Sequence, residues 1–378
     1  MTTNEKIEAI LQNHQRWLAS AKTTGQRADF SGAQLDGYDF SNSDLSAALF
    51  RGASLNGANL QDAQLVHADF SDASLVGARL SGTNLLLSDF TGADLRKADL
   101  SSARAASDHD LGQTRRGPRF KDADLQEANL SQTYAYLSDF SGANLAKAKL
   151  HGALLAQANL AENNLSGINL SAANLTNANL QGSNFSNTNL TNTLLINANL
   201  KHSQLSHADI SGANLQSANL ANAKVDGILY NRKTKFRGIR VFSCYGSSRF
   251  KRFAQDQDYI EEFKEAHPFS YYVWAGLTDC GRSITRVVLW SLALVLVFGL
   301  VYFVIGEQAF ALTNRETLQW NLFTTTYYSV VTFTTLGFGD ITPRTPLAAG
   351  FVMLEVIVGY LMLGILISIL ATKVARRS

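Results

Sequence analysis

Apolar residues recur at every fifth position through the first two thirds of the chain. From Phe30 to Val225, 36 of the 40 positions in this phase are Leu, Phe, Ile or Val. Two residues before most of them stands Ala, Ser or Thr, and Asn or Asp commonly lies between. A period of five matches neither an α-helix nor a strand. The pattern indicates a solenoid, a narrow tube with one large and one small inward side chain on each side.

This pattern resembles the repeat of the pentapeptide-repeat family, and the resemblance covers about 200 residues. The family forms a right-handed, four-sided (quadrilateral) β-helix, which implies four repeats per coil. Phe30, Phe50, Phe70 and Phe90 are spaced by 20 residues, so they are expected to stack on one face. Coils that rise by about 4.8 Å each would build a tube of roughly ten coils.

The period fails within residues 101–119, a charged stretch that contains Gly and Pro. Phe120 and Phe140 then resume the spacing of 20 residues, but Phe120 follows Phe90 by 30. They return to the earlier Phe face only if about ten residues loop out of the tube. The loop is either a protrusion that binds a partner or a tolerated insertion.

The open apolar ends of such a tube need covering. Residues 1–25 place Ile7, Ile10, Leu11, Trp17 and Leu18 at helical spacing, which predicts a capping helix. The β-helix is accordingly expected to span residues 26–230.

Two uncharged or nearly uncharged segments near the end of the chain are long enough to cross a membrane. They run from Val287 to Ile305 and from Leu347 to Ala371, the second containing Glu355. Each exceeds the length that ~30 Å of hydrocarbon requires. Buried helices of a soluble protein are the alternative. Because a charge at the bilayer centre is costly, Glu355 is expected to face protein and to hydrogen-bond the back of the helical stretch that lies between the two segments, in a neutral form.

The segment between these two spans combines a helical stretch, Asn321 to Thr332, with glycines at alternate positions, Gly337 and Gly339. Non-helical backbone is tolerated at membrane depth only where protein or water surrounds it. Glycine permits backbone angles that other residues avoid, so successive carbonyl groups can turn to one side. Four such loops around an axis would form rings of oxygens that replace the water shell of an ion.

The sequence TTLGFGD at residues 334–340 resembles the potassium-channel signature TTVGYGD, and the layout from 287 to 371 resembles that of two-helix potassium channels. The resemblance implies an all-α pore domain at 286–378, assembled as a homotetramer with K⁺ as the permeant ion and no cofactor. It assigns the selectivity filter and K⁺ coordination to Thr335, Leu336, Gly337, Phe338 and Gly339, with the Thr335 hydroxyl at the inner end and Gly339 and Asp340 closing the outer mouth.

Other residues are expected to support the filter or to move. The support set is Thr334, Asp340, Tyr327, Tyr328 and Glu355. Many relatives carry Glu in the pore helix where this chain has Val331, so Asp340 must find another partner. Gly359 and Gly364 of the second span either form a hinge and gate or allow close packing of helices.

The segment 231–285 is expected to be a basic linker with an interfacial helix. Between residues 232 and 252 stand eight basic residues and no acidic one. So close to a membrane helix, they indicate anionic lipid rather than nucleic acid. Because the basic residues flank the inner ends of both spans, the two termini are expected in the cytoplasm of a bacterial cell, with the pore domain in its inner membrane as a multi-pass segment.

The leading functional hypothesis is a potassium-selective channel whose cytoplasmic β-helix regulates it or acts as a scaffold for an unknown protein or ligand. The alternative is a membrane-tethered scaffold with little or no conduction. A third possibility, a DNA-mimicking protein, calls for a strongly acidic tube, whereas residues 27–226 carry 19 acidic and 14 basic side chains. An enzyme is disfavoured because no His, Cys or carboxylate cluster has catalytic spacing. Two cysteines do not make a disulfide framework.

Overall fold

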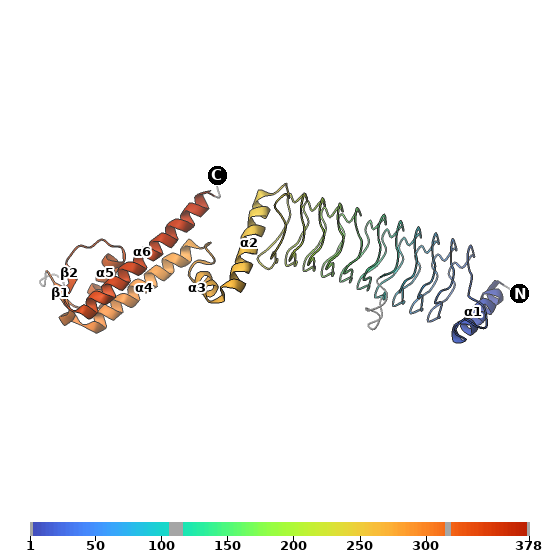
Figure 1. Cartoon of the computed structure of the whole chain (residues 1–378), viewed down its shortest axis with the longest axis horizontal. Coiled ribbons are helices and arrows are strands. Elements are labelled where there is room, and N and C mark those ends of the chain that lie inside the picture. The colour runs from blue at the N-terminus through green and yellow to red at the C-terminus, as the bar shows by residue number, and fades with distance from the viewer. Residues whose placement is uncertain (1–2, 106–115, 314–318, 376–378) are drawn as a thin grey trace. The chain divides into compact units, whose positions relative to one another are not determined.

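The computed structural model describes residues 3–105, 116–313 and 319–375 (Figure 1). It divides into two compact units, Met1–Glu261 and Glu262–Ser378. The first is a β-helix with a helix at each end, and the second is a group of helices with a short two-stranded sheet.

The first unit is a four-sided β-helix, as the repeat predicts. Parallel bridges join residues 20 apart, such as Asp29 with Leu49 and Gln34 with Ser54, so each coil contains four repeats. The residues of the five-residue phase point inward and are buried. Phe50 stacks on Phe70 with ring centroids 4.6 Å apart, and Phe70 on Phe90 at 4.9 Å. The tube therefore has one continuous core along its axis.

Each corner of the β-helix is a tight turn that explains the polar residues of the repeat. The amide of Ala33 donates to the carbonyl of Phe30, and Gly32 between them has φ of 66°. A positive φ at this place is that of a type II turn, which favours Gly, Asn and Asp. Where Ser or Thr takes the small inward position, its hydroxyl usually bonds a backbone carbonyl, as Thr188 does with Leu165. Most buried hydroxyls of the narrow interior are paired in this way, whereas the Ser138 hydroxyl has no partner among the described residues.

The interruption near residues 101–119 is an insertion of ten residues. Bridges at this point join residues 30 apart, Asp89 with Arg119 and Arg104 with Tyr134. Phe120 stacks on Phe90 at 5.2 Å, so the prediction that it continues the Phe face is confirmed. Residues 106–115 of the predicted loop lie outside the described residues.

The β-helix extends past residue 230, where the sequence analysis ended it. Bridges continue to Tyr245, but their spacing changes from 20 to 21 residues, as in Lys224 with Tyr245. One extra residue near Asn231 shifts the phase, so that Phe236 and Val241 become the large inward residues. The basic segment is therefore not a linker here: it forms the last coil, with its Lys and Arg side chains outside.

A helix lies at each end of the tube. Helix α1 (Thr3–Ala19) packs Ile7 against the core, with Ile10 and Leu11 partly buried beside it. Helix α2 (Ser248–Ala266) buries Phe250 and Ala254, and the Phe250 ring meets Phe236 with centroids 5.9 Å apart.

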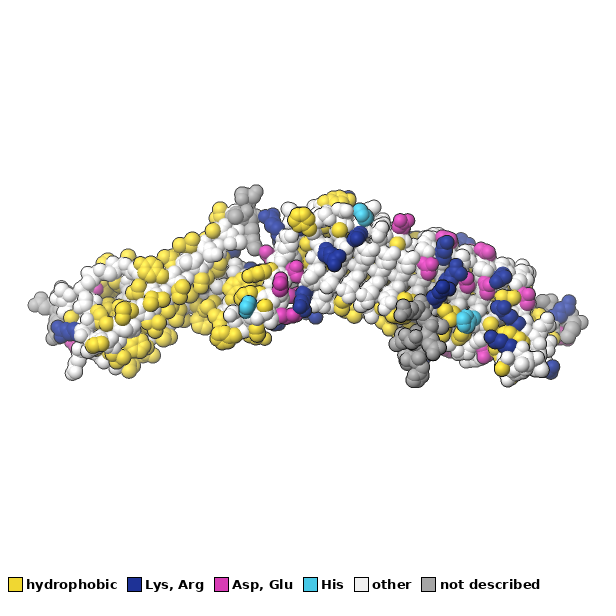
Figure 2. Space-filling view, in the orientation of Figure 1, with side chains coloured by type: hydrophobic (Ala, Val, Ile, Leu, Met, Phe, Trp, Pro, Cys, Tyr) yellow, Lys and Arg dark blue, Asp and Glu magenta, His cyan; other side chains and the backbone are white. Residues whose placement is uncertain are grey.

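The second unit contains the two apolar helices that the sequence predicts. Helix α4 (Ile284–Ile305) and helix α6 (Pro346–Ala375) are each long and apolar enough to span a membrane. Around them lie α3 (Pro268–Thr278), a 3₁₀ turn η1 (Glu307–Ala309), β1 (Phe310–Leu312), α5 (Leu322–Phe333) and β2 (Ile341–Pro343). Figure 2 shows hydrophobic side chains covering the surface of these helices, whereas charged side chains are distributed over the coils of the β-helix.

Candidate ion-conduction site

The stretch TTLGFGD begins at the end of α5, which we call the pore helix. Asn321 caps the start of this helix, its side chain accepting from the Thr324 amide at 2.9 Å. The pore helix lies against α4 at Gly299, where a Cβ would come within 2.9 Å of Thr326. At its other end the amide of Leu336 still donates to the carbonyl of Val331. The helix thus leads directly into the loop that follows.

The backbone of the loop alternates in conformation. Thr335, Gly337 and Gly339 have φ of 59°, 57° and 73°, whereas Leu336 and Phe338 between them do not enter the positive region. A positive φ is rare for a β-branched residue such as threonine. Residues held in such conformations persist where the surroundings determine them and gather at functional sites.

Four consecutive carbonyl groups of this loop have no hydrogen-bond partner among the described residues. They belong to Thr335, Leu336, Gly337 and Phe338. The carbonyls on both sides are occupied. Thr335 Oγ1 donates to the carbonyl of Thr334 at 2.7 Å, and the carbonyls of Gly339 and Asp340 accept from Thr313. Among the described residues, the loop therefore presents a bounded row of four unpaired carbonyl oxygens, a type of arrangement that is able to coordinate a dehydrated cation.

Two of the predicted support residues, Tyr327 and Tyr328, make different contacts in the structure. The Tyr327 hydroxyl interacts with the Asp340 carboxylate, which also accepts from the Ile341 amide at 3.1 Å. Tyr327 thus provides the partner that Asp340 was expected to need. Tyr328 turns instead into the cluster of Tyr302 and Phe310, with centroids 5.3 and 5.7 Å away.

Glu355 joins the three helices behind the loop, and its expected contact with the pore helix is present. The carboxyl group is fully buried and bonds Ser329 of the pore helix and the hydroxyl of Tyr302 on α4. Ser329 also donates to the carbonyl of Val295 at 2.8 Å. Because Ser329 has one hydroxyl hydrogen for two partners, a protonated Glu355 that donates to Ser329 satisfies every group.

The two glycines of α6 have different surroundings. A Cβ at Gly359 would overlap the carbonyl oxygen of Phe333, whereas one at Gly364 would meet nothing within 4 Å. Gly359 therefore permits close packing of α6 against the end of the pore helix. The helix is continuous through both positions.

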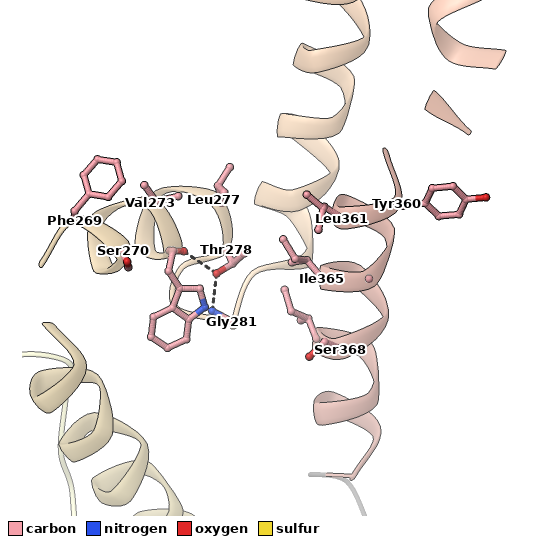
Figure 3. A pocket seen from close by; sticks show the side chains of 13 residues that line it. Phe269, Ser270, Val273, Leu277, Thr278, Gly281, Tyr360, Leu361, Ile365 and Ser368 are labelled. Carbon is pink, nitrogen blue, oxygen red and sulfur yellow. Dashed lines mark hydrogen bonds between the residues drawn. The ribbon is translucent and has the colours of Figure 1, made fainter. Parts of the chain in front are cut away.

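Gly364 lines a cavity of ≈ 650 Å³ between α3 and α6, shown in Figure 3. Val273 and Leu277 of α3 contribute apolar side chains to it, as do Leu361 and Ile365 of α6. The cavity does not include the loop. A smaller one, of ≈ 210 Å³, is lined by Thr334, Thr335 and Gly359 among others and lies where the loop leaves the pore helix.

Sequence reasoning missed three residues at this site. Ser329, Tyr302 and Thr313 carry ordinary residue types with no motif around them. The only available signal was Glu355 itself, because a buried carboxyl group in an apolar helix requires partners.

Comparison with known families agrees with this geometry. A family model described as an ion channel matches residues 290–376, and a model of pentapeptide repeats matches eight copies between residues 28 and 228. The chain is an ion-channel domain joined to pentapeptide repeats. Neither family is one of enzymes, and the channel match together with the two apolar helices indicates a membrane protein.

Solved structures of pentapeptide-repeat proteins are similar to part of the chain. HetL from the cyanobacterium Nostoc sp. strain PCC 7120, involved in heterocyst differentiation regulation, is 26% identical, with 62% of this chain and 96% of HetL covered and a TM-score of 0.30. Rfr23 from the cyanobacterium Cyanothece 51142 is 26% identical over 43% of this chain and 89% of its own, with a TM-score of 0.16. QnrB1, a plasmid-mediated fluoroquinolone resistance protein, is 16% identical over 53% and 90%, with a TM-score of 0.33. No curated protein matches the chain.

Proposed function

We propose that this ion channel is selective for potassium and that four copies of the chain surround one pore. The row of four free carbonyls from Thr335 to Phe338 carries the proposal, since rings of backbone oxygens replace the hydration shell of K⁺. Gly337 within the row has a positive φ, which keeps successive carbonyls available on one side.

The exposure of the loop in a single chain supports assembly. Leu336 and Phe338 are 59% and 63% exposed, although both are large and apolar. One row of oxygens cannot surround an ion, and exposed apolar side chains beside it require further protein. Neighbouring copies of the same loop supply both the remaining oxygens and the packing. The proposed assembly is a homotetramer with K⁺ as permeant ion and no cofactor.

The proposed location is the inner membrane of a bacterial cell, with both termini in the cytoplasm. Support comes from Arg282 just before α4, Arg286 in the first turn of α4 and Lys373 near the end of α6, which mark one end of each apolar helix as positive. Lipid is then the partner of the exposed apolar side chains on α4 and α6 that the assembly leaves uncovered.

The β-helix is proposed to regulate or anchor the channel through a protein or ligand that binds it, and not through nucleic acid. Its inward side chains are used entirely in its own core, so binding would involve the outer faces. Asn and Asp side chains form ladders there, as Asn159, Asn179 and Asn199 do, bonded at 3.0 and 3.1 Å. Such faces are polar and lack a strong net charge.

The test is cation flux into liposomes that contain the purified full-length protein. We expect K⁺ flux that Ba²⁺ blocks. Gly337→Ala should reduce it, because a Cβ at a φ of 57° costs about 1–2 kcal/mol. Gly350→Ala is the matched control, since a Cβ at Gly350 would meet nothing within 4 Å. Absence of flux from assembled tetramers would contradict the proposal and favour the membrane-tethered scaffold.

A further inference from the structure

The loop from Thr334 to Asp340, which we call the filter loop, is hydrogen-bonded at its far end to Thr313. This residue directly follows strand β1, which precedes the pore helix in the chain. Strand β1 pairs with β2 in antiparallel register, with Phe310 opposite Pro343 and Leu312 opposite Ile341. Continuing this ladder by one residue, the amide of Thr313 donates to the carbonyl of Asp340 at 2.9 Å. Its hydroxyl donates to the carbonyl of Gly339 at 3.1 Å.

Strand β1, which Thr313 directly follows, is anchored in the core of the second unit. Phe310 is fully buried, and its ring lies 5.5 Å from that of Tyr302 and 5.2 Å from that of Trp320. Behind β2, the amide of Arg344 donates to the carbonyl of Ala309 at 2.8 Å. Thr313 is therefore held in place by the anchored strand before it. It bonds the two carbonyls that directly follow the four unpaired ones.

The two bonds of Thr313 divide the loop into two parts. The carbonyls of Gly339 and Asp340 are occupied, whereas the four before them have no partner among the described residues. Without the Thr313 hydroxyl, the Gly339 peptide would have no bond to fix its orientation, and Gly339 is free to rotate because glycine tolerates both signs of φ. The Phe338 carbonyl belongs to the preceding peptide unit, which is joined to this one through the φ and ψ angles of Gly339.

We propose that Thr313 is a positioning residue that sets the outer limit of the ion-coordinating row. Its hydroxyl holds the Gly339 carbonyl out of the row and so keeps the Phe338 carbonyl as the last coordinating oxygen. This inference rests on the proposed function as a potassium channel. It assigns a role in selectivity to a residue that lies 26 positions from its partner and belongs to no motif.

The test compares four forms of the full-length protein in planar bilayers. Thr313→Val removes the hydroxyl and keeps the shape and the backbone amide. Thr313→Ser keeps the hydroxyl. Thr342→Val is the matched control, because Thr342 lies in the paired strand, opposite Ala311, and no side-chain hydrogen bond is recorded for it among the described residues. The quantity measured is the ratio of K⁺ to Na⁺ permeability, obtained from the reversal potential.

We expect Thr313→Val to lower the ratio by roughly two- to tenfold, the range set by the net contribution of one hydrogen bond. Thr313→Ser and Thr342→Val should keep the wild-type ratio. A selective wild type with equal ratios in Thr313→Val and Thr342→Val would overturn the inference alone. An unselective wild type would overturn the proposed function and the inference with it.

If Thr313→Val fails to form the assembly seen by size-exclusion chromatography, Thr313→Ala against Thr313→Ser gives the same comparison. Both shorten the side chain, and only serine retains the donor. A ratio that falls in the alanine variant and not in the serine variant supports the role of the hydroxyl, and equal ratios refute it.

Discussion

Gly359 of α6 lies directly against the carbonyl oxygen of Phe333, the last residue of the pore helix. No space remains there for a Cβ, so the contact requires glycine. Helix α6 and the pore helix are therefore in contact where the loop from Thr334 to Asp340 begins.

Replacement of Gly359 by alanine should separate α6 from the pore helix and reduce both thermal stability and flux. The matched control is Gly364→Ala, whose Cβ would meet nothing within 4 Å. That change should be neutral or stabilising by up to about 1 kcal/mol, because alanine favours the helix. Thermal unfolding in detergent and flux in liposomes check both variants. Equal melting temperatures in the two would show that the Phe333 contact does not constrain the helices.

Glu355 is expected to act as a neutral hydrogen-bonding group. Glu355→Gln should therefore be tolerated, since the amide can donate to Ser329 and accept from the Tyr302 hydroxyl. Glu355→Ala should destabilise the protein by about 1–3 kcal/mol, because it leaves buried polar groups unpaired. Denaturation in detergent measures both variants. If glutamine is as damaging as alanine, the carboxyl group is ionised and the assignment of its proton is wrong.

The N-terminal cap is expected to loosen in acid. His14 of α1 is fully buried, its Nδ1 accepts from the Ala28 amide at 3.1 Å, and its Nε2 has no partner among the described residues. Burial lowers the pKa of His14 below its usual 6.5, despite the opposing effect of Asp44, while Arg27 also lowers it. Because the unfolded state then binds more protons, the stability from docking is complete above about pH 6.5 and is lost as the pH falls through the lowered pKa.

Hydrogen exchange of the full-length protein tests this expectation. Residues 3–19 should lose protection between about pH 7.5 and about pH 5.5, on either side of the unperturbed histidine pKa, after correction for intrinsic exchange rates. His14→Gln should remove the pH dependence, whereas the exposed His202→Gln should not. Protection that stays constant in the wild type would rule out a role for His14 in docking α1.

The second unit should form the pore without the first, because it has cores of its own around Phe310 and around Val287. A variant lacking residues 1–261 is expected to form tetramers and conduct K⁺ selectively, with a changed open probability. Removing only residues 1–230 should give a poorly soluble protein, since it exposes the last coil at Phe236. Single-channel recording checks open probability, and identical values with and without the β-helix would mean that it does not regulate the pore.

The repeat predicted most of the first unit because its period is a direct consequence of the coil. The ten-residue insertion could also be counted, since Phe120 had to return to the face of Phe90. The last coil was missed for the same reason: one extra residue moved Phe236 and Val241 out of the phase used for counting. Basic residues on the outside of that coil then suggested a linker.

In the second unit, the sequence predicted the contact of Glu355 with the helix that precedes the loop, while the role of the loop as a selectivity filter stays a prediction. It did not distinguish Gly359 from Gly364, because their difference is a distance between two helices. Nor did it indicate Thr313, which follows a strand of only three residues that pairs with a segment beyond the pore helix. Contacts of this kind depend on how distant segments meet, which no local pattern records.

The reversal potential of the purified full-length protein, in bilayers with K⁺ on one side and Na⁺ on the other, tests the central claim most directly. In the proposed tetramer, each ring contains one carbonyl group from each of the four copies. A stack of such rings should pass K⁺ far better than Na⁺. The current should then reverse close to the K⁺ equilibrium potential. A reversal near zero, showing equal permeability to the two ions, would contradict the account of the loop from Thr335 to Phe338 as a potassium filter.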